Sequence, residues 1–148
     1  MNQPAGERQA AESTQSVVME RVFAHPAEKV WRALTESPLL AQWLMRNDFE
    51  PTAGRRFQFR SEPVPNWDGV IECEVMVVEH LKQLSYSWKA LGLDSLVLWT
   101  LTPVEGGTHV RMEHSGFRED QQHAFKGAGY GWRRFLDGLE KLLDGGAA

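Results

Sequence analysis

The stretch FKGAGYGWRRFLDGLEKLL, residues 125–143, decides the fold expected for this chain. Its apolar side chains recur at the 3.6-residue period of a helix, and charged side chains occupy the opposite face. Such a helix would span about 28 Å at about 1.5 Å per residue, which is long enough to cross a small sheet. Gly145-Gly146 is expected to end it. Its apolar face consists of Phe125, Ala128, Trp132, Phe135, Leu136, Leu139 and Leu143.

The chain before this helix alternates apolar and polar residues with a period of two, which is typical of half-buried strands. Short turns separate the alternating runs, so we expect antiparallel hairpins rather than crossovers. The run 96–101 is apolar throughout and is interpreted as a strand buried on both faces. The sequence does not show which face of the first strand points inward, because Glu20 and Arg21 fall on opposite sides. The predicted strands are residues 17–24, 56–60, 71–77, 84–89, 96–101 and 109–114.

Two short helices are predicted between the first and second strands. Pro26 stops the first strand and suits the first turn of a helix, and Ser37 can cap a second helix that has Pro38 at its first position. A twisted sheet of this size must curl around the long helix, and the short helices would fill the open end. The expected fold is therefore α+β, with a curved antiparallel sheet of six or seven strands wrapped around the C-terminal helix.

Length and composition restrict the possible functions. A chain of 148 residues is the size of one domain, and its net charge of -4 without a basic cluster argues against nucleic acid as a partner. No apolar run is long enough to span a membrane, and the single cysteine, Cys73, fits a reducing cytosol, so we expect a cytoplasmic protein. Residues 1–15 have few large apolar side chains and are expected to be a disordered tail before a single domain, 16–148. No spacing typical of a metal or cofactor site occurs.

A curved sheet around a straight helix leaves concave apolar gaps, where small ligands bind. Gly129 falls on the inner helix face, where it either clears space for a ligand, allows close backbone packing, or precedes a helix that starts near Tyr130. His114 shares a strand face with apolar residues, and it is either a polar contact for the ligand or a hydrogen-bonded structural histidine. Trp67, on a proline-rich loop, either guards the pocket mouth or caps the core edge. The predicted ligand-binding residues are Trp43, Phe57, Phe59, Tyr86, Trp88, Met112, His114, Phe125, Gly129 and Trp132.

Three segments carry a resemblance to a known family: VFAHPAEKVWRALTESPLLAQWL (22–44), WDGVIECEVMVVEHLKQLSYSW (67–88) and GYGWRRFLDGLEKLL (129–143). Together they resemble the START-like ligand-binding superfamily, in its branch related to the activator of Hsp90 ATPase. The match covers about residues 17–143. It implies the helix-grip fold with a cavity between helix and sheet. It implies no single activity, because the superfamily includes lipid and hormone binders, polyketide cyclases, oxygenase domains and a chaperone-activating domain.

Three functions follow as hypotheses. The first is a non-enzymatic module that binds a small apolar, aromatic or lipid-like molecule in the cavity. The second is a cyclase- or hydrolase-type enzyme that uses His114 or Tyr86 as acid or base. The third is a stress- or chaperone-related interaction module, and a homodimer is also possible. The co-chaperone of the resembling branch carries a separate N-terminal Hsp90-binding domain for which this chain has no room, so Hsp90 is not expected as a partner.

Overall fold

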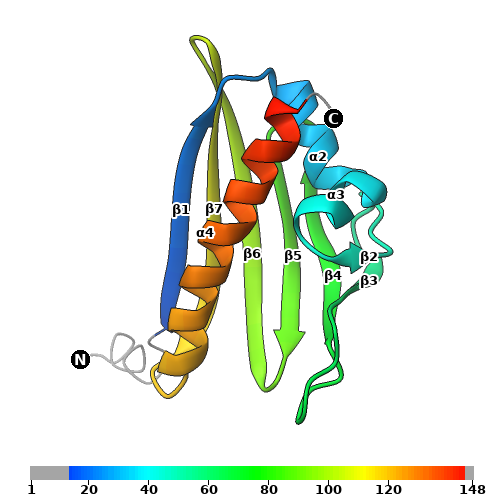
Figure 1. The fold of residues 1–148 in the computed structure, drawn as a ribbon, viewed down its shortest axis with the longest axis vertical. Coiled ribbons are helices and arrows are strands. Elements are labelled where there is room, and N and C mark those ends of the chain that lie inside the picture. Colours follow the sequence, from blue (N-terminus) through cyan, green and yellow to red (C-terminus); the bar gives the residue numbers. More distant parts are fainter. Residues whose placement is uncertain (1–13, 146–148) are drawn as a thin grey trace, which may run out of the picture.

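A curved antiparallel sheet around one long helix forms the architecture of residues 14–145, the part of the chain that the computed structural model describes (Figure 1). The strands in this part are β1 (Thr14–Phe23), β2 (Arg46–Asn47), β3 (Arg56–Arg60), β4 (Val70–Glu79), β5 (Gln83–Ala90), β6 (Leu93–Val104) and β7 (Gly107–Arg118). The helices are α2 (Ala27–Thr35), α3 (Ser37–Trp43) and α4 (Gln122–Asp144). All seven strands form one sheet in the order β1-β7-β6-β5-β4-β3-β2. The predicted fold class is confirmed.

β1 begins earlier than the sequence predicts. Thr14 and Gln15, expected in the disordered tail, pair with Arg118 and Phe117 of β7. Both side chains of this first pair of residues are exposed. An edge strand is held by backbone hydrogen bonds to its neighbour, so it can extend through polar residues that bury nothing. The rest of the predicted tail, residues 1–13, lies outside the described residues.

β6 is buried on one face only, whereas the sequence predicted burial on both. Val97, Trp99 and Leu101 are at most 4% exposed, but Leu96 on the other face is 44% exposed. All three helices lie on the same side of the sheet, and none covers the outer side (Figure 1). The apolar run of β6 therefore does not indicate that a second layer covers the outer face of the sheet.

The two short helices and the segment after them fill one half of the space beneath the sheet. Trp43 of α3 packs edge-on against Trp99, with ring centroids 5.7 Å apart. Phe49 packs against Phe57 at 5.0 Å and against Tyr86 at 6.2 Å. This half of the sheet is thus covered by protein side chains.

α3 begins differently from the prediction. Glu36 occupies the position before its first turn and makes no side-chain cap bond, while Ser37 is the first helical residue. The Ser37 hydroxyl instead donates to the backbone carbonyl of Asn47 at 3.0 Å. The hydroxyl therefore ties α3 to β2 rather than closing the helix end.

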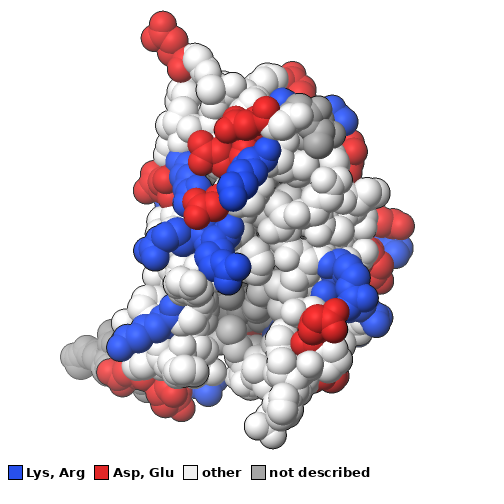
Figure 2. All heavy atoms as spheres, in the orientation of Figure 1, with Lys and Arg blue, Asp and Glu red and all other residues white. Residues whose placement is uncertain are grey.

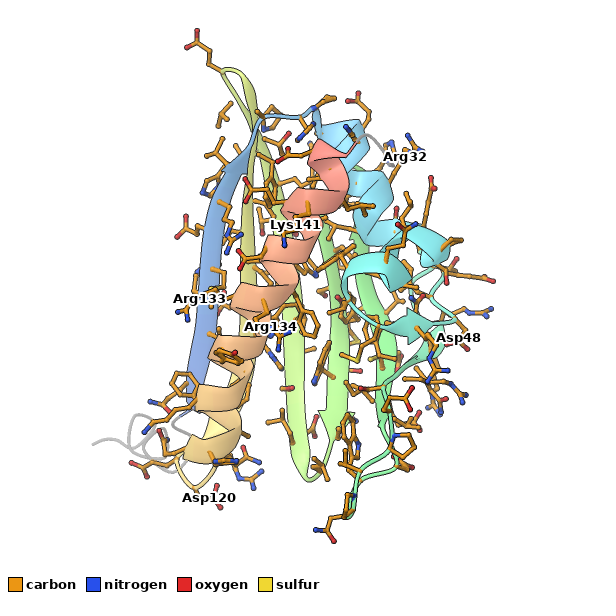
Figure 3. All side chains as sticks on the ribbon, viewed as in Figure 1. Arg32, Asp48, Asp120, Arg133, Arg134 and Lys141 are labelled. Carbon is orange, nitrogen blue, oxygen red and sulfur yellow. The ribbon has the colours of Figure 1, made fainter. Side chains whose placement is uncertain are left out.

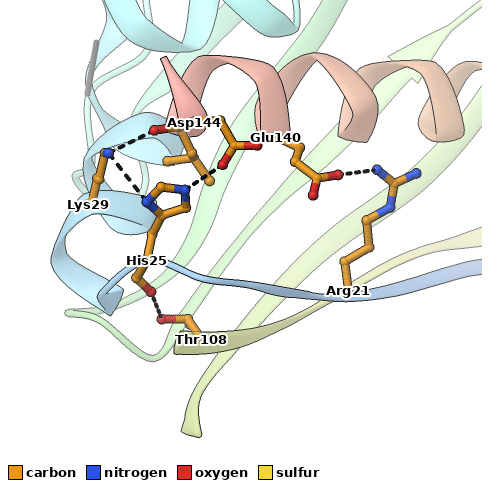
Figure 4. Close-up of polar contacts among 7 residues, drawn as sticks. Arg21, His25, Lys29, Thr108, Glu140 and Asp144 are labelled. Atoms are coloured by element: carbon orange, nitrogen blue, oxygen red, sulfur yellow. Dashed lines mark hydrogen bonds and ion pairs between the residues drawn. The ribbon is translucent and has the colours of Figure 1, made fainter. Parts of the chain in front are cut away.

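Polar contacts fix the C-terminal part of α4 to β1 and α2 (Figure 4). His25 Nε2 lies 2.7 Å from Asp144 Oδ1, and Lys29 Nζ donates to the Leu143 carbonyl at 2.7 Å. Arg21 of β1 forms ion pairs with carboxylates of α4, so the face of β1 that carries Arg21 is the one that points inward.

The buried side chains of α4 are Trp132, Leu136, Leu139 and Leu143. Residues 122–131 include no buried side chain, so the first part of α4 stands off the sheet.

Candidate functional site

A pocket of about 720 Å³ lies between the first part of α4 and the sheet. Figure 2 shows this face hollowed beside α4, and the hollow is mostly white, meaning free of charged side chains. The helix contributes Ala124, Gly127, Ala128, Gly131, Trp132 and Phe135 to the wall. The sheet and its loops contribute Trp67, Ile71, Trp88, Ala90, Leu91, Leu93, His114 and Phe117. Polar residues gather where α4 begins, with Asp120 (labelled in Figure 3), Gln121 and His123.

Small residues form the helix side of the pocket. A Cβ atom added to Gly127 would meet nothing within 4 Å, and one added to Gly131 would meet only the Phe135 ring, at 3.9 Å. Gly129, one of the predicted ligand-binding residues, does not line the pocket. At about 100° per residue, Gly129 lies about 60° from Trp132, on the side away from Gly131. The glycines that line the pocket are therefore Gly127 and Gly131, on the other side of Trp132 from Gly129.

His114 is the centre of a buried hydrogen-bond chain. The Trp132 indole Nε1–H donates to His114 Nδ1 at 2.9 Å, and His114 Nε2 lies 2.8 Å from Ser95 Oγ. The Ser95 hydroxyl donates its proton to the Trp88 carbonyl at 2.7 Å, so its oxygen must accept from His114. These directions assign the neutral tautomer with the proton on Nε2. The chain links α4, β7, β6 and β5 around the pocket.

The same contacts limit the chemistry that His114 can perform. His114 is 1% exposed, and burial lowers the pKa of its imidazole to about 4. Its basic nitrogen, Nδ1, already accepts the Trp132 proton. A general base needs a free lone pair within reach of substrate. In this arrangement His114 positions Trp132 in the pocket wall and has no nitrogen free for a ligand.

Tyr86 lies outside the pocket wall, in the filled half of the core. Its hydroxyl accepts a hydrogen bond from Trp99 Nε1 at 3.0 Å. Burial raises the pKa of this phenol well above its ordinary value, so it stays protonated. Tyr86 therefore serves as a buried acceptor for the core.

Three of the ten predicted lining residues line the pocket, and Gly129, described above, is one of the seven that do not. Trp88, His114 and Trp132 line the pocket. Phe125 packs edge-on against Phe117, with centroids 5.6 Å apart, and does not reach the wall. The remaining residues are buried in the main core cluster: Trp43, Phe57, Phe59, Tyr86 and Met112. Four of them lie on the inner face of the sheet and Trp43 lies on α3, and protein side chains already cover all five.

Several residues of the site were not among the predicted ligand-binding residues. Trp67, for which two roles were open, lines the pocket mouth, and its indole donates to the Val70 carbonyl at 3.1 Å. Leu91 is 70% exposed in the turn between β5 and β6 and forms part of the opposite rim. Gly127 and Gly131 are four residues apart on one helix face. That spacing, together with the alanines beside it, was the signal that could have identified this wall.

Other chemistry finds little support in the described residues. No three or more His, Cys, Asp or Glu side chains within residues 14–145 are grouped to hold a metal ion. Cys73 is buried, and burial raises the pKa of its thiol, which disfavours the reactive thiolate. In the described part of the chain, no helix has the length and hydropathy needed to cross a membrane.

Comparison with known proteins adds a family to this geometry. The model of the family described as "Activator of Hsp90 ATPase homolog 1-like protein" matches residues 24–144. Protein MLL2253 from Mesorhizobium loti is 49% identical, with a TM-score of 0.83 over 88% of this chain and 97% of that chain. Protein BH1534 from Bacillus halodurans is 27% identical, with a TM-score of 0.75 over 86% and 96%. The Aha1 dimer from Colwellia psychrerythraea, at 20% identity and a TM-score of 0.76 over 87% and 96%, shares the fold. No curated protein matches the chain.

Proposed function

This chain belongs to the family of activator of Hsp90 ATPase homolog 1-like proteins, and from that premise we propose that it binds one small, mostly apolar molecule in the pocket beside α4. The observation that carries the proposal is the pocket itself. Its volume of about 720 Å³ falls within the roughly 300–1,000 Å³ of ordinary small-molecule sites. A protein without such a role gains stability by filling a gap of this size.

The chemistry of the wall supports an apolar ligand. Trp88, Trp132 and Phe117 form the deep side, and each is at most 8% exposed. Polar side chains lie at one end, where Asp120 and His123 flank the start of α4. A ligand with an apolar body and a polar group directed toward that end fits this distribution.

The arrangement of titratable groups favours binding over acid–base catalysis. A catalytic pocket is expected to bring together two or more groups with shifted pKa values. Here His114 is the only such group in the wall, and both its ring nitrogens have protein partners. Tyr86, the other candidate, is absent from the lining. The cyclase or hydrolase alternative therefore has less support than the binding function.

Two glycine substitutions on the same helix provide a matched test. Gly131→Leu should extend a side chain into the pocket, whereas Gly129→Leu should place the same side chain on the other side of α4. Both replace a glycine inside a helix, so each should gain about 1 kcal/mol of helix propensity. The probe is 1-anilinonaphthalene-8-sulfonate, whose fluorescence rises in an apolar site. We expect Gly131→Leu to weaken probe binding at least about ten-fold and Gly129→Leu to leave it unchanged, about 1.4 kcal/mol being ten-fold.

Native mass spectrometry of the freshly purified wild-type protein supplies the second measurement. A co-purified small molecule that is lost in Gly131→Leu, but kept in Gly129→Leu, would support the proposal. Equal probe binding by both variants, with melting temperatures at or above that of the wild type, would show that the pocket is not the binding site.

A further inference from the structure

Trp88 lies in the wall of this pocket and has an unusual indole. The residue is 8% exposed, and its ring contacts those of Phe59, His114 and Trp132 at centroid distances of 5.3–5.4 Å. Its carbonyl accepts the Ser95 hydroxyl, but its Nε1–H donates to no residue in the described chain. A buried polar group without a partner costs about 1–3 kcal/mol and calls for an explanation.

The other two indoles of the wall are already committed. Trp67 Nε1–H donates to the Val70 carbonyl at 3.1 Å, and Trp132 Nε1–H donates to His114 Nδ1 at 2.9 Å. Both nitrogens of His114 are occupied as well. Within the described part of the deep wall, Trp88 therefore holds the one side-chain donor that remains free.

We propose that the Trp88 indole Nε1–H is the hydrogen-bond donor that positions the ligand, and that the ligand is an apolar molecule carrying an acceptor oxygen such as a ketone carbonyl. This inference rests on the proposed binding function and names the chemical class of its ligand. The aromatic walls take the apolar body, and a carbonyl oxygen satisfies the buried donor. A carbonyl oxygen only accepts, whereas a hydroxyl or amine would also bring a donor, and the nearest side-chain acceptor, His114 Nδ1, is already taken by Trp132.

The test uses 9-fluorenone and fluorene, which differ only by a carbonyl in place of a methylene group. Their dissociation constants are measured for the wild type, Trp88→Phe and the control Trp67→Phe. The control makes the same substitution in the same pocket, but removes an indole proton that is already donated. Trp88→Phe should lower the preference for fluorenone over fluorene about ten-fold, and Trp67→Phe should leave it unchanged. The ratio within each variant cancels any general loss of packing.

Nuclear magnetic resonance of the wild-type protein gives a readout that does not require Trp88→Phe to fold. The chain has six tryptophans, and each indole N–H gives its own signal. The Trp88 signal, assigned through its contacts with Phe59 and His114, should move further downfield on adding fluorenone than on adding fluorene, whose rings act on it only through their ring currents.

The outcomes separate the two proposals. Suppose that both compounds bind the wild type, that Trp88→Phe keeps the same preference for fluorenone over fluorene, and that fluorenone moves the Trp88 signal no further than fluorene does. The proposed role of Trp88 is then wrong, and the binding function stands. If neither compound nor the anilinonaphthalene probe binds the wild type, the binding function fails, and the role of Trp88 fails with it.

Discussion

Replacing His114 with glutamine tests the hydrogen-bond chain that holds the pocket wall. Burial lowers the pKa of His114 in the folded protein from 6.5 to about 4. Between these pH values the unfolded chain binds a proton at His114 and the folded chain does not. Falling pH therefore favours the unfolded chain. The contribution of neutral His114 to stability is complete above about pH 6.5 and is lost as the pH falls through the folded pKa.

The size of the effect follows from the same values. A pKa difference of about 2.5 corresponds to about 3 kcal/mol, at about 1.4 kcal/mol for each factor of ten. About 1.4 kcal/mol should be lost by about pH 5.5, and about 3 kcal/mol by about pH 4. The side chain is 1% exposed, so solvent screening does not reduce this figure appreciably.

The assay compares urea unfolding of the wild type and His114→Gln at about pH 7.5, 5.5 and 4, followed by tryptophan fluorescence. Glutamine cannot take up a proton, and the substitution leaves every other ionisable group in place. The wild type should therefore lose about 3 kcal/mol more than the variant across this range. A difference between the two proteins that stays constant within about 0.5 kcal/mol would refute a buried, neutral His114.

Three further substitutions test other contacts. Tyr86→Phe should lower the free energy of unfolding by about 1–3 kcal/mol in urea titrations, because a buried indole N–H loses its acceptor. Tyr130→Phe, at a site that is 62% exposed, is the control and should change it by less than about 0.5 kcal/mol. Lys29→Met should lower the free energy of unfolding by about 1–2 kcal/mol, since it removes the charged donor to the Leu143 carbonyl at the end of α4. An unchanged free energy of unfolding would contradict that role. Gly127→Ala should raise the melting temperature by improving helix propensity by about 1 kcal/mol, and a decrease would mean that the site is not open.

The main elements were predictable because their signals are local. The periods of two and 3.6 gave six strands and the long helix, and the proline positions gave the two short helices. β2, at Arg46–Asn47, was missed because two residues show no period. Thr14 and Gln15 were misassigned to a tail, because pairing to β7 uses their backbone and leaves no trace in their side chains.

The candidate site was only partly predictable. Trp88, His114 and Trp132 stand on apolar faces, and that pattern placed them toward the interior. The pattern could not distinguish the half of the interior filled by Phe49 and the short helices from the half left open. Gly129 was chosen over Gly131 because it lies at helical spacing from Phe125 and Trp132, and the spacing of Gly127 and Gly131 was overlooked.

From the order of residues alone it follows that a long amphipathic helix lies against an antiparallel sheet with one apolar face. The 3.6-residue period of the helix and the two-residue period of the strands are both visible among residues that are close together along the chain. Only the tertiary structure shows where helix and sheet separate, that Trp132, His114 and Ser95 are joined by hydrogen bonds, and that Trp88 Nε1–H has no partner among the described residues. These features depend on the rotation of α4 about its axis and on the polar contacts at its C-terminal end. Both are set by contacts between residues far apart in the chain.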